Sequence, residues 1–271
     1  TGSVYFSRNH FANHAAINVL WHVGYSLTKL GEYKQDIHLL DQNKATELFK
    51  KSVSWNPAQK RMLKNERPNV VIIVLESFTK NIIGRSPQGH ELTTGFNQLI
   101  REGIYFDRFY ASGDRSDKGL VAILSGYPAQ PQSSVIRFPE KTQKLPYISQ
   151  DLKKTGYHTS FYYGGDIEFA NMKSYFIHGG FDLIVHKEDF KGLELNSKWG
   201  AHDHVVFGRL FQDIKTSNGK FLKVIFTLSS HEPYEVPMPK RFKGNSEETG
   251  FFNSAYYTDS CLFYFINQCK T

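Results

Sequence analysis

The apolar positions from residue 68 onward follow two different periods. Unbroken apolar runs rich in β-branched residues, such as residues 69–78, are typical of strands buried on both faces of a parallel sheet. Apolar residues spaced three and four apart predict helices between these runs. The pattern predicts strands over 69–78, 104–112, 158–165, 181–186 and 221–230, and helices over 92–103, 117–128, 145–157, 203–217 and 252–271. Repeated β-α-β units predict an α/β fold, here an α/β/α sandwich with a mostly parallel sheet.

The first part of the chain has a different pattern. Residues 14–33 and 43–55 have helical spacing, and a charged connector, residues 60–68, follows them. We therefore expect a helical N-terminal arm over residues 1–67 and a main domain over residues 68–271. The arm fits a membrane-proximal linker, and a helical lid packed on the domain is equally compatible with the pattern.

Composition narrows the classes of function. The 271 residues are 40% hydrophobic and carry a formal net charge of +7, which suits an anionic partner. The basic residues are scattered and no basic-aromatic platform stands out, so nucleic-acid binding is disfavoured. Cys261 and Cys269 lie about 12 Å apart along the predicted helix, too far for a disulfide. No apolar stretch approaches the roughly 20 residues that span a membrane, and the first residues do not form a signal peptide.

Polar residues follow the predicted strands at three places. Glu76 ends the first apolar run, Ser116 follows the second predicted strand after a short loop, and His231 follows the last strand. Ligands of open α/β sheets bind beyond the carboxyl ends of the strands, where these residues lie. Each also has an ordinary structural explanation: Glu76 as a turn residue, Ser116 as a helix N-cap, and His231 as a loop histidine.

The combination of these residues points to chemistry on an anion. Glu76 and Ser116 at neighbouring strand ends can share a divalent cation, which lowers the pKa of a coordinated hydroxyl and neutralises an anionic substrate. The N-terminus of the helix after Ser116 also favours an anion. Arg115 can donate hydrogen bonds to two phosphate oxygens at once, and Lys118 adds a positive point charge. The pattern predicts that Ser116 attacks a phosphate or sulfate ester.

Other catalytic patterns are absent from the sequence. There is no GxGxxG after the first strand, no GxxxxGK[ST] and no HExxH, and Ser116 does not lie in a GxSxG elbow. His202, Asp203 and His204 cluster near a predicted helix start, where alternate side chains converge poorly on a metal. We interpret this cluster mainly as a helix cap and surface.

Several motifs together resemble a known family in order and approximate spacing. Any one of them is weak, but the set is specific, and it consists of the residues 69–78, 112–131, 161–176, 198–207 and 227–237. Over residues 68–271 the chain resembles the extracytoplasmic catalytic domain of the lipoteichoic-acid-synthase-like sulfatases, within the alkaline phosphatase superfamily. The resemblance implies an α/β/α sandwich whose metal site lies at the strand ends.

The resemblance also implies roles for individual residues. Glu76 matches a metal ligand, and Ser116 takes the place of a threonine that is both nucleophile and metal ligand. His231 matches a substrate-contacting histidine, so Arg115, Lys118 and His231 are expected to bind the substrate. A divalent metal (Mn²⁺, Mg²⁺ or Zn²⁺) and a phospholipid- or glycan-linked anionic substrate are implied. Attachment to the cell membrane through segments before residue 1 would place the domain on the periplasmic or extracellular side.

Two departures from the family pattern limit these expectations. The polymerase branch has a Phe-Trp-Asn-Arg stretch, whereas residues 169–172 read Phe-Ala-Asn-Met, which argues against glycerol-phosphate polymerisation. The family's remaining metal ligands are an Asp-His pair after the last predicted helix, past Thr271. We therefore expect a C-terminally truncated domain with an incomplete metal site, which binds metal weakly or not at all and is inactive as given.

Two hypotheses of different classes follow. The first is a metal-dependent phosphoryl or sulfuryl ester transferase or hydrolase that acts at the outer face of a membrane through a covalent Ser116 intermediate. The sulfatase signature C/S-x-P-x-R does not begin at Ser116, which favours phosphoryl over sulfuryl transfer. The alternative is a non-catalytic binding or regulatory module on the same fold. An Asp-His pair in the parent reading frame would distinguish the two.

Overall fold

The chain divides into two compact units, Thr1–Lys64 and Asn65–Thr271. The computed structural model describes residues 19–29, 40–52, 54, 62–130 and 133–271. Within the first unit the described residues form the helices α2 (Val19–Lys29) and α3 (Gln42–Ser52). Both helices fall in segments whose apolar spacing predicts helix. The linker role of residues 1–67 stays a prediction.

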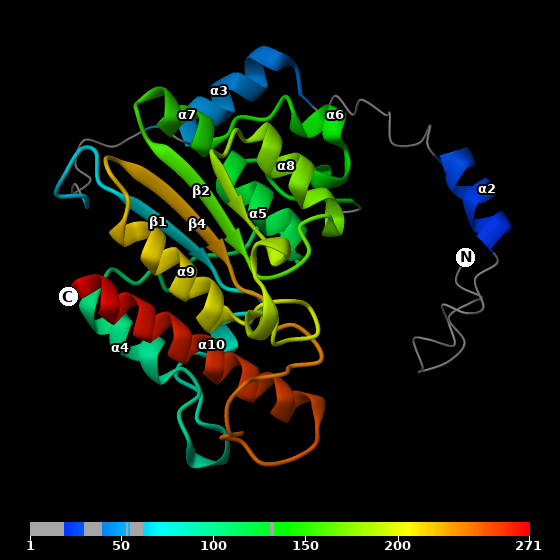
Figure 1. Cartoon of the computed structure of the whole chain (residues 1–271). Helices are drawn as coiled ribbons and strands as arrows, with labels where there is room; N and C mark the ends of the chain where they lie inside the picture. The colour runs from blue at the N-terminus through cyan, green and yellow to red at the C-terminus, as the bar shows by residue number, and fades with distance from the viewer. Residues whose placement is uncertain (1–18, 30–39, 53, 55–61, 131–132) are drawn as a thin grey trace. The chain divides into compact units, whose positions relative to one another are not determined.

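The second unit is built on a four-stranded sheet with the order β1-β4-β2-β3 (Figure 1). Its strands are β1 (Val70–Val74), β2 (His158–Tyr163), β3 (Leu183–Val185) and β4 (Phe221–Phe226). Every neighbouring pair is parallel, which confirms the expected parallel sheet. The inner strand β4 is buried along its whole length, whereas β1 at the edge is half-buried.

Helices cover both faces of the sheet and complete the α/β/α sandwich (Figure 1). One face carries α5 (Ser116–Ser125), α7 (Ile148–Lys154) and α8 (Met172–His178), and the other carries α4 (Thr94–Glu102), α9 (Asp203–Lys215) and α10 (Glu247–Lys270). A short helix α6 (Pro139–Thr142) and 3-10 turns lie in the loops, at Lys80–Ile82, Pro87–Gly89, Val135–Arg137, Phe169–Asn171, Lys187–Asp189 and Gly192–Glu194.

Each face of the sheet has its own hydrophobic core. On the α5 face, Phe161 of β2 stacks on Phe176 of α8 with 3.6 Å between ring centroids, and Leu120 of α5 packs in the same cluster. On the opposite face, Phe207 of α9 packs against Phe265 of α10 at 5.0 Å. Each fully buried phenylalanine contributes about 1.5–3 kcal/mol of transfer free energy, so the first contact holds α8 on the sheet and the second holds α9 and α10 together.

Residues 104–112 do not form the strand that their pattern predicts. Ile104, Phe106 and Phe109 are 65%, 58% and 83% exposed, and the segment is a loop that leads into α5. An aromatic-rich run can look like a strand in sequence, but a strand also needs a neighbour to pair with, which local periodicity does not report. The fold class is unaffected because the remaining predicted strands form the sheet.

The helix ends follow capping rules. Gly126, at φ 61°, is the C-cap of α5, so the glycine stop predicted there is confirmed. Helix α10 starts before its predicted beginning because Ser246 accepts a hydrogen bond from the Thr249 N–H as an N-cap. Cys261 and Cys269 are both free, as the helical spacing predicts.

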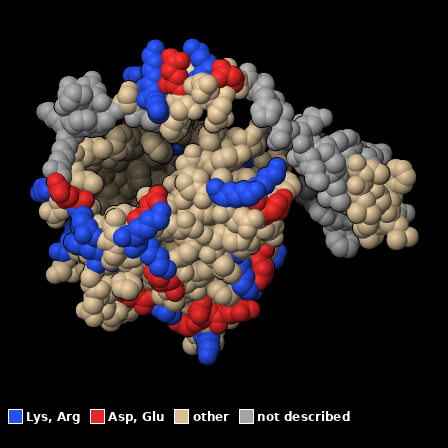
Figure 2. Space-filling view, turned by 90° about the horizontal axis from the view of Figure 1, so that it is seen from above, with Lys and Arg blue, Asp and Glu red and all other residues tan. Residues whose placement is uncertain are grey.

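The face of the molecule shown in Figure 2 carries charges of both signs. Lys and Arg side chains are interspersed there with Asp and Glu. This mixture fits the scattered basic residues of the sequence and not a continuous basic surface. Among the described helices, none combines the length and apolar character that crossing a bilayer requires.

Candidate active site

The carboxyl ends of β1 and β4 are joined by the side chain of Thr227. This residue directly follows β4, and its Oγ1 accepts a hydrogen bond from the Glu76 N–H at 2.8 Å. Glu76 lies just beyond β1 and is half-buried. Parallel strands end at the same edge of a sheet, so Glu76 lies at the edge where α/β proteins bind ligands.

Ser116 lies directly against the Glu76 carboxylate. Ser116 Oγ donates a hydrogen bond to Glu76 Oε2 at 2.6 Å, and Ser77 Oγ donates to Glu76 Oε1 at 3.0 Å. A short O–H···O⁻ bond of this kind is charge-assisted. The structure thus brings together the two residues that the sequence nominates as nucleophile and metal ligands, while their chemical roles stay predictions.

The backbone around Ser116 forms an uncapped helix start. Ser116 is the first residue of α5, and the N-cap is Arg115, whose side chain makes no capping hydrogen bond. The alternative explanation of Ser116 as the N-cap is therefore wrong, because its hydroxyl bonds to Glu76. The first N–H groups of such a helix can bind an anion. The hydroxyl and a potential anion site thus share one helix end.

The two cations beside Ser116 have different surroundings. Arg115 is exposed at the N-cap. Lys118 is largely buried, and its Nζ pairs with Asp114 Oδ1 at 3.0 Å. The hydrogen bond from Lys118 lowers the pKa of Asp114, whose carboxyl is exposed. Part of the Lys118 charge is thus compensated by Asp114, whereas Arg115 presents its guanidinium to solvent; substrate binding by either residue stays a prediction.

His231 is an exposed residue in the segment after β4. Its ring contacts Trp199 edge-on, with 5.5 Å between ring centroids, and its Nδ1 lies 3.0 Å from the Glu232 carbonyl oxygen. The Trp199 indole N–H donates to the same carbonyl. The sequence reasoning did not single out Trp199, since its contact with His231 joins segments that are distant along the chain. Substrate contact by His231 stays a prediction.

Asp203 is a buried structural residue of this edge. Only 1% of it is exposed, and its Oδ1 accepts from the backbone N–H groups of Leu228 at 2.8 Å and Ser229 at 3.2 Å. Its Oδ2 accepts from Thr258 Oγ1 at 2.7 Å, and the Asp203 N–H donates to Ser229 Oγ at 3.0 Å. The carboxylate therefore joins α9, α10 and the segment after β4 that leads to His231.

The surface assignment of the histidine-aspartate cluster is wrong for His202 and Asp203. His202 is 3% exposed, and its ring nitrogens lie 2.7 Å from Asn196 Oδ1 and 3.1 Å from the Glu235 carbonyl oxygen. His204 is exposed, as the surface assignment expects, and partial burial of its ring lowers its pKa. His202 and Asp203 are buried because loops and α10 cover the start of α9, which the local sequence does not show.

Two glycines allow the loop before α9 to pack against the end of β2. A Cβ on Gly164 would come within 2.2 Å of the Ala201 carbonyl oxygen, and one on Gly200 within 2.1 Å of the Gly164 carbonyl oxygen. The Ala201 N–H donates to Gly164 O at 2.9 Å across this contact. Gly200 also has φ +147°, which favours glycine. This close backbone approach fixes the loop that carries Trp199.

Tyr163 is the last residue of β2 and lies at the same edge. It is 6% exposed, and its ring stacks on Phe226 with 5.2 Å between centroids. Burial raises the pKa of its hydroxyl, and the negative charges of Glu76, Asp166 and Asp203 raise it further. The sequence reasoning missed Tyr163; its position at the end of a predicted strand is the signal that could have found it.

The donor atoms at Glu76 and Ser116 fit a hard divalent cation in kind, since both are oxygens. The number of donors is too small for a complete site. Among the residues that the structure describes, no group of three or more His, Cys, Asp or Glu side chains could hold a metal. Metal binding by Glu76 and Ser116 therefore stays a prediction.

Comparison with known proteins identifies the family. The sulfatase family model matches residues 68–271. The chain belongs to the sulfatase family. Within this family, the expected resemblance to the lipoteichoic acid synthases is confirmed by curated relatives from Bacillus subtilis (strain 168). The chain is 24% identical to lipoteichoic acid synthase-like YvgJ over 74% of its length, and 28% identical to lipoteichoic acid synthase 2 over 76%.

A solved structure supports the same assignment of this sulfatase-family chain. A protein in the alkaline phosphatase superfamily from Vibrio parahaemolyticus is 30% identical and superposes with a TM-score of 0.74, covering 85% of this chain and 60% of that protein. The chain spans only about a third of the length of the two Bacillus relatives, 34% and 33%. The comparisons therefore establish the family and the fold of this chain.

Proposed function

We propose that this domain transfers or hydrolyses phosphoryl esters with Ser116 as the nucleophile. The observation that carries the proposal is the 2.6 Å hydrogen bond from Ser116 Oγ to Glu76 Oε2 at the start of α5. A hydroxyl held by a carboxylate is oriented for attack, and the helix N-terminus beside it favours a phosphate group. The names of the curated relatives, lipoteichoic acid synthases, support a phosphoryl-group reaction.

The first step forms a bond between Ser116 Oγ and phosphorus, while the bond from phosphorus to the leaving oxygen breaks. The hydroxyl proton passes along the hydrogen bond to Glu76 Oε2 as the Oγ–P bond forms, and the leaving oxygen gains a proton from solvent. In the second step, the oxygen of water or of an acceptor hydroxyl bonds to phosphorus as the Oγ–P bond breaks. The attacking oxygen loses its proton to solvent, and Ser116 Oγ regains the proton from Glu76. Glu76 and Ser116 would hold a divalent cation, whose positive charge would lower the pKa of the hydroxyl and neutralise the phosphate.

Phosphoryl transfer is favoured over sulfuryl transfer. Ser116 is followed by Asp117 and Lys118, so the signature C/S-x-P-x-R does not start there. Ala170 and Met172 replace the Trp and Arg of the polymerase branch, which argues against glycerol-phosphate polymerisation. We therefore propose transfer to water or to a single glycan or lipid hydroxyl.

The proposal extends to substrate and location. We assign Arg115, Lys118 and His231 to binding of a phospholipid- or glycan-linked anionic substrate. Residues 1–67 would connect the catalytic domain, residues 68–271, to a membrane, with the domain on its outer side. The family of lipoteichoic acid synthases supports this arrangement, although the described helices include no membrane span.

A second function is favoured by one observation. Glu76 and Ser116 contact each other, but the described residues contain no group of three or more His, Cys, Asp or Glu side chains that could hold a metal. A domain that stays without further ligands would bind an anionic glycan or lipid and not cleave it. The parent reading frame separates the two functions, because catalysis requires additional ligands, such as an Asp-His pair, and the binding module does not.

Ser116→Ala tests the catalytic proposal. With the protein expressed from its complete reading frame and supplied with Mn²⁺ or Mg²⁺, we expect kcat/KM for a chromogenic phosphodiester to fall about 10³-fold or more, because the nucleophile is lost. Ser86→Ala serves as a control, since Ser86 is an exposed serine whose side chain makes no capping hydrogen bond, and the activity of this variant should match that of the unmodified protein. Equal activity of Ser116→Ala and the unmodified protein would remove Ser116 from the mechanism.

A further inference from the structure

Six tyrosines among the described residues are buried, and Tyr163 differs from the other five. The five are each held by a hydroxyl contact: Tyr147 to Thr142, Tyr157 to Pro68, Tyr162 to Asp213, Tyr175 to Ser125 and Tyr257 to His204. The Tyr163 hydroxyl has no hydrogen-bond partner within the described part of the chain. The Tyr163 hydroxyl oxygen is not among the fully buried polar atoms that lack a partner in the described residues, so it is accessible from solvent and open to a ligand.

The sheet register places Tyr163 on the same face as the Glu76–Ser116 pair. Tyr163 and Val74 both pair with Phe226, from its two sides, so they lie at the same level of the sheet. Strands are about 4.8 Å apart, so Tyr163 and Val74 are separated by about 10 Å. Val74 faces α5, and Glu76 accepts a hydrogen bond from Ser116, the first residue of α5, so the pair lies at the α5 side of the sheet.

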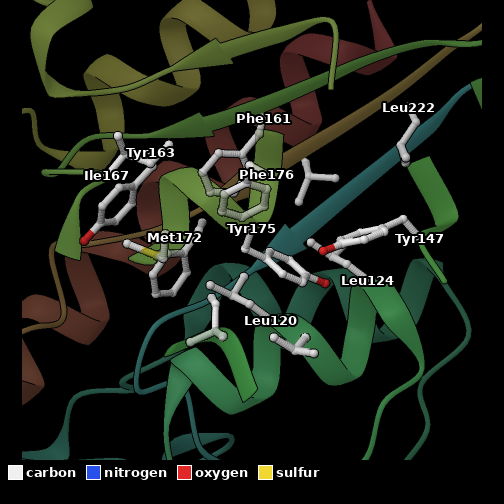
Figure 3. Close-up of a cluster of buried hydrophobic side chains, with 14 of the residues drawn as sticks. Leu120, Leu124, Tyr147, Phe161, Tyr163, Ile167, Met172, Tyr175, Phe176 and Leu222 are labelled. Carbon is white, nitrogen blue, oxygen red and sulfur yellow. The ribbon is translucent and has the colours of Figure 1, made fainter. Parts of the chain in front are cut away.

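The Tyr163 ring is held rigidly in this position. It stacks on Phe226 with an interplanar angle of 14°, and Ile167 and Met172 pack in the same cluster. A Cβ on Gly165 would lie 2.7 Å from the Tyr163 hydroxyl oxygen, so glycine there leaves room for the phenol. Figure 3 shows Tyr163 at the end of the cluster away from Tyr147, with its hydroxyl pointing away from the other labelled side chains.

We propose that Tyr163 is a substrate-contacting residue whose hydroxyl donates a hydrogen bond to a phosphate oxygen of the substrate. The assignment rests on the proposed phosphoryl-transfer function. A rigid donor at the strand edge stabilises charge on phosphate without reorganising during the reaction. Burial and the nearby carboxylates raise the pKa of Tyr163, so its hydroxyl stays protonated at neutral pH, as that of an ordinary tyrosine does. The nearby carboxylates would repel an unaccompanied anion, so the uncapped α5 N-terminus and Arg115 must offset their charge.

Tyr163→Phe and Tyr147→Phe form a matched pair that tests this assignment. Each removes one hydroxyl from the same hydrophobic cluster, but the Tyr147 hydroxyl donates to the Thr142 carbonyl at 2.8 Å. We expect Tyr163→Phe to lower kcat/KM for a phosphodiester about 10- to 100-fold with an unchanged Tm. Tyr147→Phe should lower Tm and leave kcat/KM unchanged, because it loses a structural hydrogen bond.

Binding of inorganic phosphate provides a readout that does not depend on turnover. In the protein expressed from its complete reading frame, phosphate should raise Tm, and Tyr163→Phe should weaken phosphate binding about 10-fold in a titration of this shift. Wild-type phosphate affinity and kcat/KM in Tyr163→Phe, or a loss of Tm as large as that of Tyr147→Phe, would overturn the assignment.

The failure of this inference is distinguishable from failure of the proposed function. If Ser116→Ala is inactive while Tyr163→Phe behaves as wild type, phosphoryl transfer by Ser116 stands and the Tyr163 contact is refuted. If Ser116→Ala retains full activity, the nucleophile assignment fails. Weaker phosphate binding by Tyr163→Phe in that case would still support the Tyr163 contact.

Discussion

Glu76 and Asp203 are both carboxylates at the carboxyl edge of the sheet, but their surroundings differ. Asp203 is 1% exposed, and backbone N–H groups of two residues and the Thr258 hydroxyl use its two oxygens. Glu76 is half-buried, and each of its oxygens accepts from one serine hydroxyl. A saturated buried carboxylate stabilises the fold, whereas a partly accessible one retains lone pairs for a cation or a proton. We therefore expect Asp203 to stabilise the fold and Glu76 to take part in the reaction, although both are carboxylates.

The largest effect on stability is expected for Asp203→Ala. The change leaves the N–H groups of Leu228 and Ser229 and the Thr258 hydroxyl without their acceptor, and each buried unpaired donor costs about 1–3 kcal/mol. We expect the free energy of unfolding in urea to fall by about 4 kcal/mol. Asp203→Asn retains one acceptor oxygen, so its free energy of unfolding should fall by less than that of Asp203→Ala. A loss under about 1 kcal/mol for Asp203→Ala would contradict the structural role.

Asp259 is an intermediate case and gives a pH-dependent effect. It is 1% exposed, and burial raises its pKa from 3.8 to about 6 despite hydrogen bonds from the Gly95 and Phe96 N–H groups. A raised folded-state pKa stabilises the fold below the unfolded pKa, and that contribution is lost as pH rises through about 6. We expect up to about 3 kcal/mol of stability to be lost between pH 4 and 6 through this group.

Unfolding of Asp259→Asn across the same pH range measures this contribution. The variant should show a flatter dependence of the unfolding free energy on pH, because the titrating group is gone. Asp151→Asn is a suitable control, since Asp151 is exposed, and it should keep the wild-type dependence. Identical pH profiles for Asp259→Asn and the unmodified protein would show that Asp259 does not titrate in this range.

Glu76→Gln should have the smallest effect on stability and a selective effect on activity. It keeps an acceptor oxygen for Ser116, so the unfolding free energy should change by no more than about 1 kcal/mol. The loss of negative charge should lower kcat/KM for a phosphodiester at least about 100-fold. Glu140→Gln, at an exposed glutamate, should leave both quantities unchanged. If Glu76→Gln destabilises as strongly as Asp203→Ala, the contrast between the two carboxylates is lost.

Parts of the fold and site could be predicted because they depend on local pattern. The apolar runs around β1 and β4, the helical spacing of α9 and the glycine stop at Gly126 each act within a few residues. The positions of Glu76 and Ser116 could be predicted because parallel strands all end at one edge of the sheet. A residue that follows such a strand in sequence therefore lies at that edge. The strand expected over 104–112 failed because local pattern does not supply a pairing neighbour.

The sequence by itself determined the parallel α/β architecture, the sulfatase-type motifs and the nomination of Glu76 and Ser116. Only the tertiary structure decided that Ser116 bonds to Glu76 at 2.6 Å and that Asp203 is buried. It alone also showed that the Tyr163 hydroxyl lacks a partner among the described residues. The physical reason is that strand and helix periods are properties of neighbouring residues, whereas burial and hydrogen-bond partners depend on segments far apart in the chain.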